Sequence, residues 1–163
     1  MYYNLGNTLK KLDRAEDAIN AFRRSVDLDP SLANAHYNLA GVLKDMGRLE
    51  DAADAYRNAI RADPGDAEAH MNLGNTLDLL GDGEAEACYL RAIDLSPNLL
   101  QAHDSLGRIA HERGDLAAAL KHYQNAIALD PDFAAAHANL ATVYRKISRL
   151  DDAEASCRRA LEL

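Results

Sequence analysis

Apolar residues recur along the whole chain in pairs of stripes, and each pair repeats after 33 or 34 residues. Within a stripe they return every three or four positions, which is the spacing of one face of an α-helix. The first four pairs of stripes end near Pro30, Pro64, Pro97 and Pro131, and a glycine-type position divides the two stripes of each pair. The pattern predicts five helix–turn–helix units, approximately 1–30, 31–64, 65–97, 98–131 and 132–163. The predicted helices are near 2–12, 15–28, 33–46, 49–62, 67–80, 83–95, 100–113, 116–129, 134–147 and 150–162.

Four columns of residues keep this period. The leucine column is Leu5, Leu39, Leu73, Leu106 and Leu140, and the small column that follows it is Gly6, Ala40, Gly74, Gly107 and Ala141. The turn column is Asp13, Gly47, Gly81, Gly114 and Ser148, and the aromatic column is Phe22, Tyr56, Tyr89, Tyr123 and Cys157. Small residues let two helices approach closely, so a large residue of the partner helix packs beside them. We therefore expect the leucine column and Cys157 in the core, and left-handed backbone in the turns.

This succession of Leu-Gly/Ala, Gly, Ala, Tyr, Ala and Asp-Pro resembles the tetratricopeptide repeat (TPR) over essentially the whole chain. The resemblance implies an all-α, right-handed superhelical solenoid that forms a single domain over 1–163. It also implies that the first helix of each unit lines a concave groove. The third unit lacks one residue between Gly81 and Ala85. We expect a tightened turn and a later start of the second helix there.

The two ends of the repeat pattern are incomplete. The first unit starts about two residues short, and the last stops at Leu163 with no polar helix after it. Stacked repeats expose an apolar flank at each end unless a polar helix covers it. We interpret the chain as a fragment of a longer protein, with end-to-end self-association as the alternative.

Composition narrows the classes of function. Acidic residues outnumber basic ones by 26 to 18, so the net charge is −8, which disfavours binding to nucleic acid. The sequence contains no apolar run of about 18 residues, so it does not predict a membrane-spanning helix. No secretory signal opens the chain, so we expect a cytoplasmic location. Cys88 and Cys157 match no zinc or redox spacing.

Four histidines share one column of the first helices: His36, His70, His103 and His137. Residues of neighbouring units are separated by a helix-packing distance of about 8–10 Å. Zinc needs nitrogen atoms at about 2.0–2.1 Å from one ion, so we expect packing in a semi-buried aromatic slot and no metal site. His111 and His122 have no obvious partner. No catalytic triad, phosphate loop or cofactor motif is present, so we expect no enzyme and no cofactor.

A polar column lies just before the leucine column: Asn4, Asn38, Asn72, Ser105 and Asn139. Asparagine is a poor residue for a helix interior. Its recurrence has two explanations. The amides could bond adjacent first helices in units descended from one ancestral repeat, or they could hold the C=O and N–H groups of an extended peptide. The second explanation is supported by a similarity to the asparagine ladder of protein O-GlcNAc transferases, although no transferase domain is present.

The predicted peptide-binding groove combines this ladder with other groove positions of the family. Its residues are Tyr3, Asn4, Asn7, Tyr37, Asn38, Met71, Asn72, Asn75, Ser105, Arg108, Asn139 and Arg145. Lys10, Gly41 and Lys44 also fall on groove positions. The expected ligand is an extended segment with an apolar anchor near units one to three and some acidic character. A clamp for chaperone tails is disfavoured, because Tyr3, Glu68 and Asn72 stand where cations are needed.

The resemblance therefore predicts a non-catalytic protein–protein interaction scaffold that binds an extended peptide segment of a protein partner. Two alternatives remain open at this point. The chain could be the substrate-binding arm of a larger enzyme, such as a glycosyltransferase, or a self-assembling adaptor.

Overall fold

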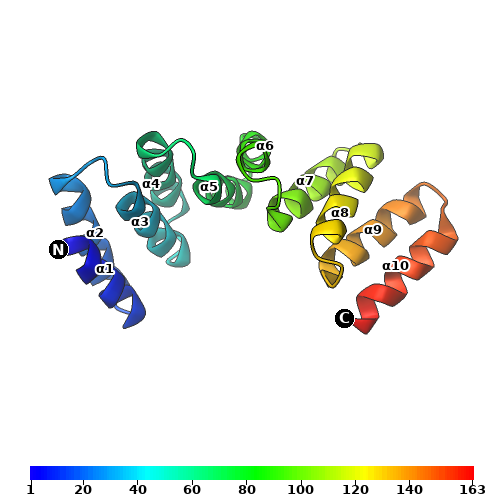
Figure 1. Cartoon of the computed structure of the whole chain (residues 1–163), viewed down its shortest axis with the longest axis horizontal. Coiled ribbons are helices and arrows are strands. Elements are labelled where there is room, and N and C mark those ends of the chain that lie inside the picture. The colour runs from blue at the N-terminus through cyan, green and yellow to red at the C-terminus, as the bar shows by residue number, and fades with distance from the viewer. The chain divides into compact units, whose positions relative to one another are not determined.

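The computed structural model describes all residues 1–163 and contains ten α-helices and no strand (Figure 1). They are α1 (Tyr2–Lys11), α2 (Ala15–Leu28), α3 (Ala33–Asp45), α4 (Leu49–Ala62), α5 (Ala67–Leu79), α6 (Ala85–Leu95), α7 (Leu100–Glu112), α8 (Leu116–Leu129), α9 (Ala134–Lys146) and α10 (Leu150–Glu162). Every boundary agrees with the predicted one within two residues. None of these helices has the length and apolar character that crossing a membrane requires.

The helices form two compact units, Met1–Leu95 and Ser96–Leu163. Unit 1 holds three hairpins, in which α1 packs on α2, α3 on α4 and α5 on α6. Unit 2 holds two, in which α7 packs on α8 and α9 on α10. Consecutive hairpins meet through α2 and α3 and through α4 and α5 in unit 1, and through α8 and α9 in unit 2. The predicted all-helical architecture of five hairpins is confirmed.

In each of the first four hairpins an aromatic ring of the second helix packs in the core beside a small residue of the first helix. Phe22, Tyr56, Tyr89 and Tyr123 are at most 2% exposed. A Cβ atom added at Gly74 would lie only 2.8 Å from the Tyr89 ring, which is closer than real Cβ contacts come. The same conflict arises at Gly6 and Gly107. These glycines are therefore required by close helix packing.

The prediction that Leu5 and Cys157 lie in the core is wrong. Leu5 is 47% exposed, whereas its equivalents Leu39 and Leu73 are buried. The second helix of the preceding hairpin packs on α3 and on α5, and no hairpin precedes α1 in this structure. Cys157 is also exposed, because α10 packs on α9 alone, whereas α2, α4 and α8 also pack on the first helix of the next hairpin.

The turns within the hairpins follow the prediction. Gly47, Gly81 and Gly114 have φ angles between 70° and 80°. Asp13 and Ser148 adopt the same left-handed backbone, with φ angles of 56° and 60°, although side chains are strained there.

Helix α6 begins later than the other second helices, as expected from the missing residue. It has 11 residues, whereas α4 has 14. The Asp82 carboxylate accepts a hydrogen bond of 2.9 Å from the backbone N–H of Glu84. This bond serves the turn that leads into Ala85, so α6 lacks the first helical turn that its equivalents have.

Candidate functional site

The predicted site residues of unit 1 lie on its three first helices, α1, α3 and α5. Those that are partly exposed there are Tyr3, Asn7, Tyr37, Asn38, Met71, Asn72 and Asn75, and together they define the first-helix face of unit 1. This face combines aromatic, thioether and amide groups. It therefore offers both apolar contact area and hydrogen-bonding groups.

The amides of this face bond neighbouring first helices. Asn38 Nδ2 on α3 donates to Asn7 Oδ1 at 2.9 Å and to the Tyr3 hydroxyl at 3.2 Å, both on α1. Asn72 Nδ2 on α5 donates to the Tyr37 hydroxyl on α3 at 2.8 Å. These hydrogen bonds join consecutive hairpins at the surface, in addition to the apolar packing beneath them.

The Tyr37 hydroxyl also donates a long hydrogen bond of 3.4 Å to the Glu68 carboxylate. Burial raises the pKa of Tyr37, and the negative charges of Glu68 and Asp66 raise it further. The phenol therefore stays protonated at neutral pH. It accepts from Asn72 and donates to Glu68, which fixes its orientation on the face.

In unit 2 the amide of Asn139 on α9 donates to Asp104 Oδ1 on α7 at 3.1 Å. Burial raises the pKa of Asp104, while the hydrogen bond from Asn139 and the charge of Arg108 oppose that shift. Arg108 also pairs with Glu112 at 2.9 Å. Unit 2 thus presents a half-buried carboxylate where unit 1 presents tyrosines.

The polar column is thus used within the fold at three of its five positions. Asn38, Asn72 and Asn139 each bond the preceding first helix, which is the first of the two explanations above. Asn4 is exposed and Ser105 is half-buried. The remaining predicted residue, Arg145, is exposed near the end of α9. The Oδ1 atoms of Asn38, Asn72 and Asn139 accept no hydrogen bond within the chain.

The histidine column has a role that the sequence analysis missed. Each Nε2 atom lies within hydrogen-bond distance of the carbonyl oxygen of the proline six residues earlier. The distances are 3.1 Å for His36 and Pro30, 3.3 Å for His70 and Pro64, 3.2 Å for His103 and Pro97 and 2.9 Å for His137 and Pro131. A carbonyl only accepts, so Nε2 carries the proton. The bond fastens the linker before each hairpin to its first helix.

His122 also has a partner, contrary to expectation. Its Nδ1 atom lies 3.3 Å from Nδ1 of His103, and the two rings are 5.6 Å apart between centroids. Because His103 donates through Nε2, its Nδ1 atom must be the acceptor of this second bond. His122 then donates through Nδ1.

Sequence profiles of known families agree with this repeated hairpin. The profile described as TPR repeat matches residues 6–47 and 107–148. Two profiles described as tetratricopeptide repeat match residues 42–99 and 136–163. The chain belongs to the tetratricopeptide repeat family. A comparison with curated protein sequences found no significant match.

Solved TPR structures share the fold. A crystal structure of MamA has a TM-score of 0.90 and 24% identity, over 99% of this chain and 88% of the MamA chain. YrrB, described as a TPR protein with an unusual peptide-binding site, has a TM-score of 0.85 and 25% identity over 99% and 84% of the two chains. PilF of Pseudomonas aeruginosa has a TM-score of 0.84 and 23% identity over 99% and 74%.

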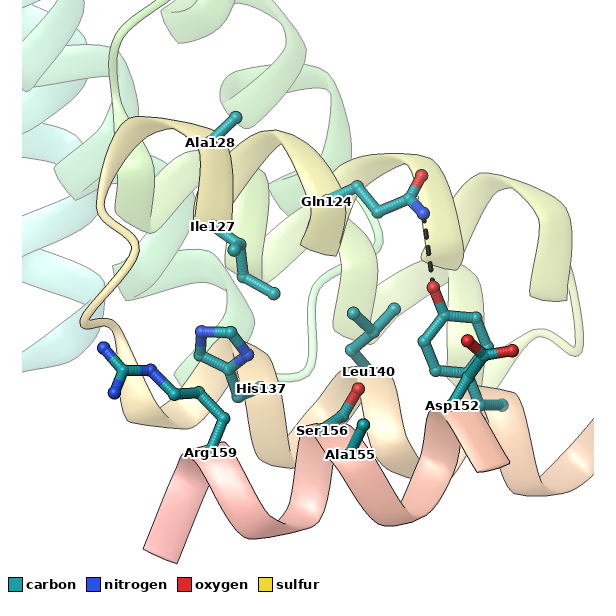
Figure 2. Close-up of a pocket in the computed structure, with 10 residues that line it drawn as sticks. Gln124, Ile127, Ala128, His137, Leu140, Asp152, Ala155, Ser156 and Arg159 are labelled. Carbon is teal, nitrogen blue, oxygen red and sulfur yellow. Dashed lines mark hydrogen bonds between the residues drawn. The ribbon is translucent and has the colours of Figure 1, made fainter. Parts of the chain in front are cut away.

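Unit 2 of the TPR chain also contains a hollow of about 430 Å³ between α8, α9 and α10 (Figure 2). Its lining residues include Gln124, Leu140, Tyr144, Ser156 and Arg159. The Gln124 amide donates to the Tyr144 hydroxyl at 3.4 Å across its rim. None of the predicted groove residues lines this hollow, so it is separate from the residues that the TPR resemblance selected.

Proposed function

We propose that this protein is a non-catalytic interaction scaffold that binds an extended peptide segment of a partner protein along the first-helix face of unit 1. The observation that carries the proposal is the arrangement of Tyr3, Tyr37 and Met71 on three consecutive first helices, each partly exposed. Between them lie Asn38 and Asn72, which donate through Nδ2 and whose Oδ1 atoms accept no hydrogen bond within the chain. Apolar anchors spaced between polar groups suit an extended peptide.

The likeness to YrrB supports the same proposal, since that TPR protein is described as having a peptide-binding site.

The expected location is the cytoplasm, where Cys88 and Cys157 would remain reduced. End-to-end self-association is a further proposed property, and light scattering at several concentrations would measure it.

The asparagines are poor test positions, because replacing them also removes hydrogen bonds between hairpins. Met71→Glu is a cleaner change, since it places a charge on the proposed apolar strip without removing any hydrogen bond. Leu90→Glu is the matched control. Leu90 lies on the second helix α6 and is 43% exposed, so the same kind of charge enters the same hairpin away from the face.

The experiment selects peptides from a phage-displayed library of random 12-residue sequences against the full-length protein. Affinities of the selected synthetic peptides are then measured by fluorescence anisotropy. We expect Met71→Glu to weaken binding by about tenfold or more, as for a central anchor, and Leu90→Glu by less than about twofold. Equal losses for the two variants, or no enriched peptide, would contradict the proposal.

A further inference from the structure

One column of the first helices carries a polar side chain in every hairpin except the second, where it is glycine. Its members are Asn7, Gly41, Asn75, Arg108 and Thr142. In the third hairpin the Tyr89 hydroxyl donates a hydrogen bond of 2.8 Å to Asn75 Oδ1. Tyr56 takes the place of Tyr89 in the second hairpin, and its hydroxyl faces Gly41, which has no side chain to accept the bond.

Neither packing nor backbone geometry requires glycine at position 41. A Cβ atom there would lie 3.6 Å from Lys10 Nζ and 3.9 Å from the Tyr56 hydroxyl oxygen, which are ordinary contact distances. The residue lies inside α3, and its φ angle is not positive. Glycine in a helix interior costs about 1 kcal/mol relative to alanine. We call the resulting recess, formed by Gly41, Lys10 Nζ and the Tyr56 hydroxyl, the Gly41 notch.

Two hydrogen-bond donors point to this notch without a partner in the chain. The Tyr56 side chain is 2% exposed and makes no hydrogen bond, yet its oxygen is not among the fully buried polar atoms. Lys10 is exposed and forms no ion pair. Burying a hydroxyl without a hydrogen-bond partner destabilises the folded protein. A ligand atom that accepts a hydrogen bond from this hydroxyl would offset that cost.

The surroundings of the notch favour an anion. Burial raises the pKa of Tyr56, and the neighbouring Tyr37 and Asp45 add to this shift, so the hydroxyl remains a donor. The Tyr37 ring meets the Tyr56 ring edge-on at 5.7 Å between centroids. Lys44 lies one turn after Gly41 on α3 and adds a second positive charge. Asp45 is exposed and is the one carboxylate that acts on Tyr56.

We infer that the Gly41 notch receives the side-chain carboxylate of a Glu or Asp residue in the extended peptide, with Lys10 and Tyr56 donating to its oxygens. An oxygen at the place of the absent Cβ atom has to move by about 1 Å to reach the usual length of such bonds. The first-helix face continues onto α1 and α5 on both sides, which fits an internal acidic residue. This inference rests on the function proposed above and names the chemistry of its ligand.

The test uses three variants of the full chain in the same peptide selection. Gly41→Asn fills the notch with the residue that caps Tyr89 in the third hairpin, and Tyr56→Phe removes only the hydroxyl. Lys10→Met removes the charge, and Lys11→Met on the same helix is its control. Synthetic peptides from the wild-type pool are compared with their Glu→Gln or Asp→Asn forms, and with forms that carry an amidated carboxyl end.

With the wild-type protein we expect an acidic residue to be enriched at one internal position, and its amide form to bind about tenfold more weakly or worse. Gly41→Asn, Tyr56→Phe and Lys10→Met should each reduce this preference severalfold, while Lys11→Met leaves it unchanged. Enriched peptides without an acidic position, dependence on the terminal carboxylate, or a preference that Gly41→Asn leaves intact would overturn the inference while the proposed function stands. A wild-type selection without enriched peptides would overturn both.

Discussion

The side-chain amide of Asn72 donates a hydrogen bond of 2.8 Å to the hydroxyl of Tyr37, which lies one hairpin earlier. We predict that Asn72→Ala destabilises the protein relative to Asn34→Ala. Asn34 is an exposed residue of α3 with no hydrogen bond, so its replacement provides the same change of side chain on a first helix without the loss of such a bond. The two free energies of unfolding should differ by about 1 kcal/mol in urea titrations. Equal stabilities would show that this bond contributes nothing.

Two glycines of neighbouring first helices should respond oppositely to the same change. Gly74→Ala places a Cβ atom 2.8 Å from the buried Tyr89 ring, and we expect a loss of about 1–3 kcal/mol. Gly41→Ala meets only ordinary contacts and should gain up to about 1 kcal/mol. Thermal unfolding by circular dichroism measures both. A loss of stability for Gly41→Ala would contradict the description of the notch as unfilled space.

The hydrogen bonds of the histidine column predict ring tautomers. His36, His70, His103 and His137 should carry the proton on Nε2, because each donates to a proline carbonyl. His122 should carry it on Nδ1, because it donates to Nδ1 of His103. Long-range ¹H–¹⁵N correlation spectra at about pH 8.5, where an ordinary histidine is neutral, distinguish the two forms. An Nε2–H form of His122 would disprove the assigned direction of that bond.

Stability should depend on pH through Asp104. Burial raises its pKa in the folded protein, so the unfolded chain loses this proton at lower pH than the folded one. The native state therefore loses stability as pH rises from the ordinary aspartate pKa of about 3.9 to the raised value. Asp104→Asn removes the ionisation and can still accept from Asn139. We expect a higher Tm than wild type at pH 7 and a shrinking difference toward pH 4, by calorimetry.

The control for this prediction is Asp94→Asn, which removes an exposed carboxylate on α6 and makes the net charge less negative by the same amount. It accounts for the general effect of removing one acidic group from a chain of net charge −8. If the two variants follow the same curve of Tm against pH, the burial of Asp104 is not the cause.

The two thiols should react at different rates. Burial, together with the charge of Glu84, raises the pKa of Cys88, which is half-buried. Only the thiolate reacts, and Cys157 is exposed. At pH 7.5 we expect iodoacetamide to modify Cys157 about tenfold faster than Cys88, as followed by mass spectrometry of tryptic peptides. Removal of the fast phase in Cys157→Ser identifies the site, and a fast phase at Cys88 would contradict its burial.

The sequence predicted the helices well because their ends are local properties. Asp-Pro pairs and glycine-type turns stop helices wherever they occur, and even the late start of α6 followed from one missing residue near Gly83. The sequence also selected the residues of the first-helix face. The period fixes which positions share a face, and this is enough to name a candidate surface.

The period does not determine which atoms meet. Asn38 and Asn72 could point to solvent or to the next helix, and only the positions of Tyr3 and Tyr37 decide between the two. The histidine bonds had a signal that went unused, since a constant interval of six residues separates proline and histidine in four hairpins. Leu5 was wrongly predicted to be buried, because the residues of its column are covered by the second helix of the preceding hairpin.

Because the hairpins are nearly identical, a peptide ligand could bind them in more than one alignment. The bond from Asn38 to Tyr3 recurs one hairpin later as the bond from Asn72 to Tyr37, so an extended chain shifted by one repeat would meet much the same groups. Gly41 breaks this repetition in the second hairpin, and Met71 takes the place of a tyrosine in the third. A peptide whose acidic residue bound the Gly41 notch would have only one alignment along the hairpins. This one contact would then determine which hairpin each other residue of the peptide meets.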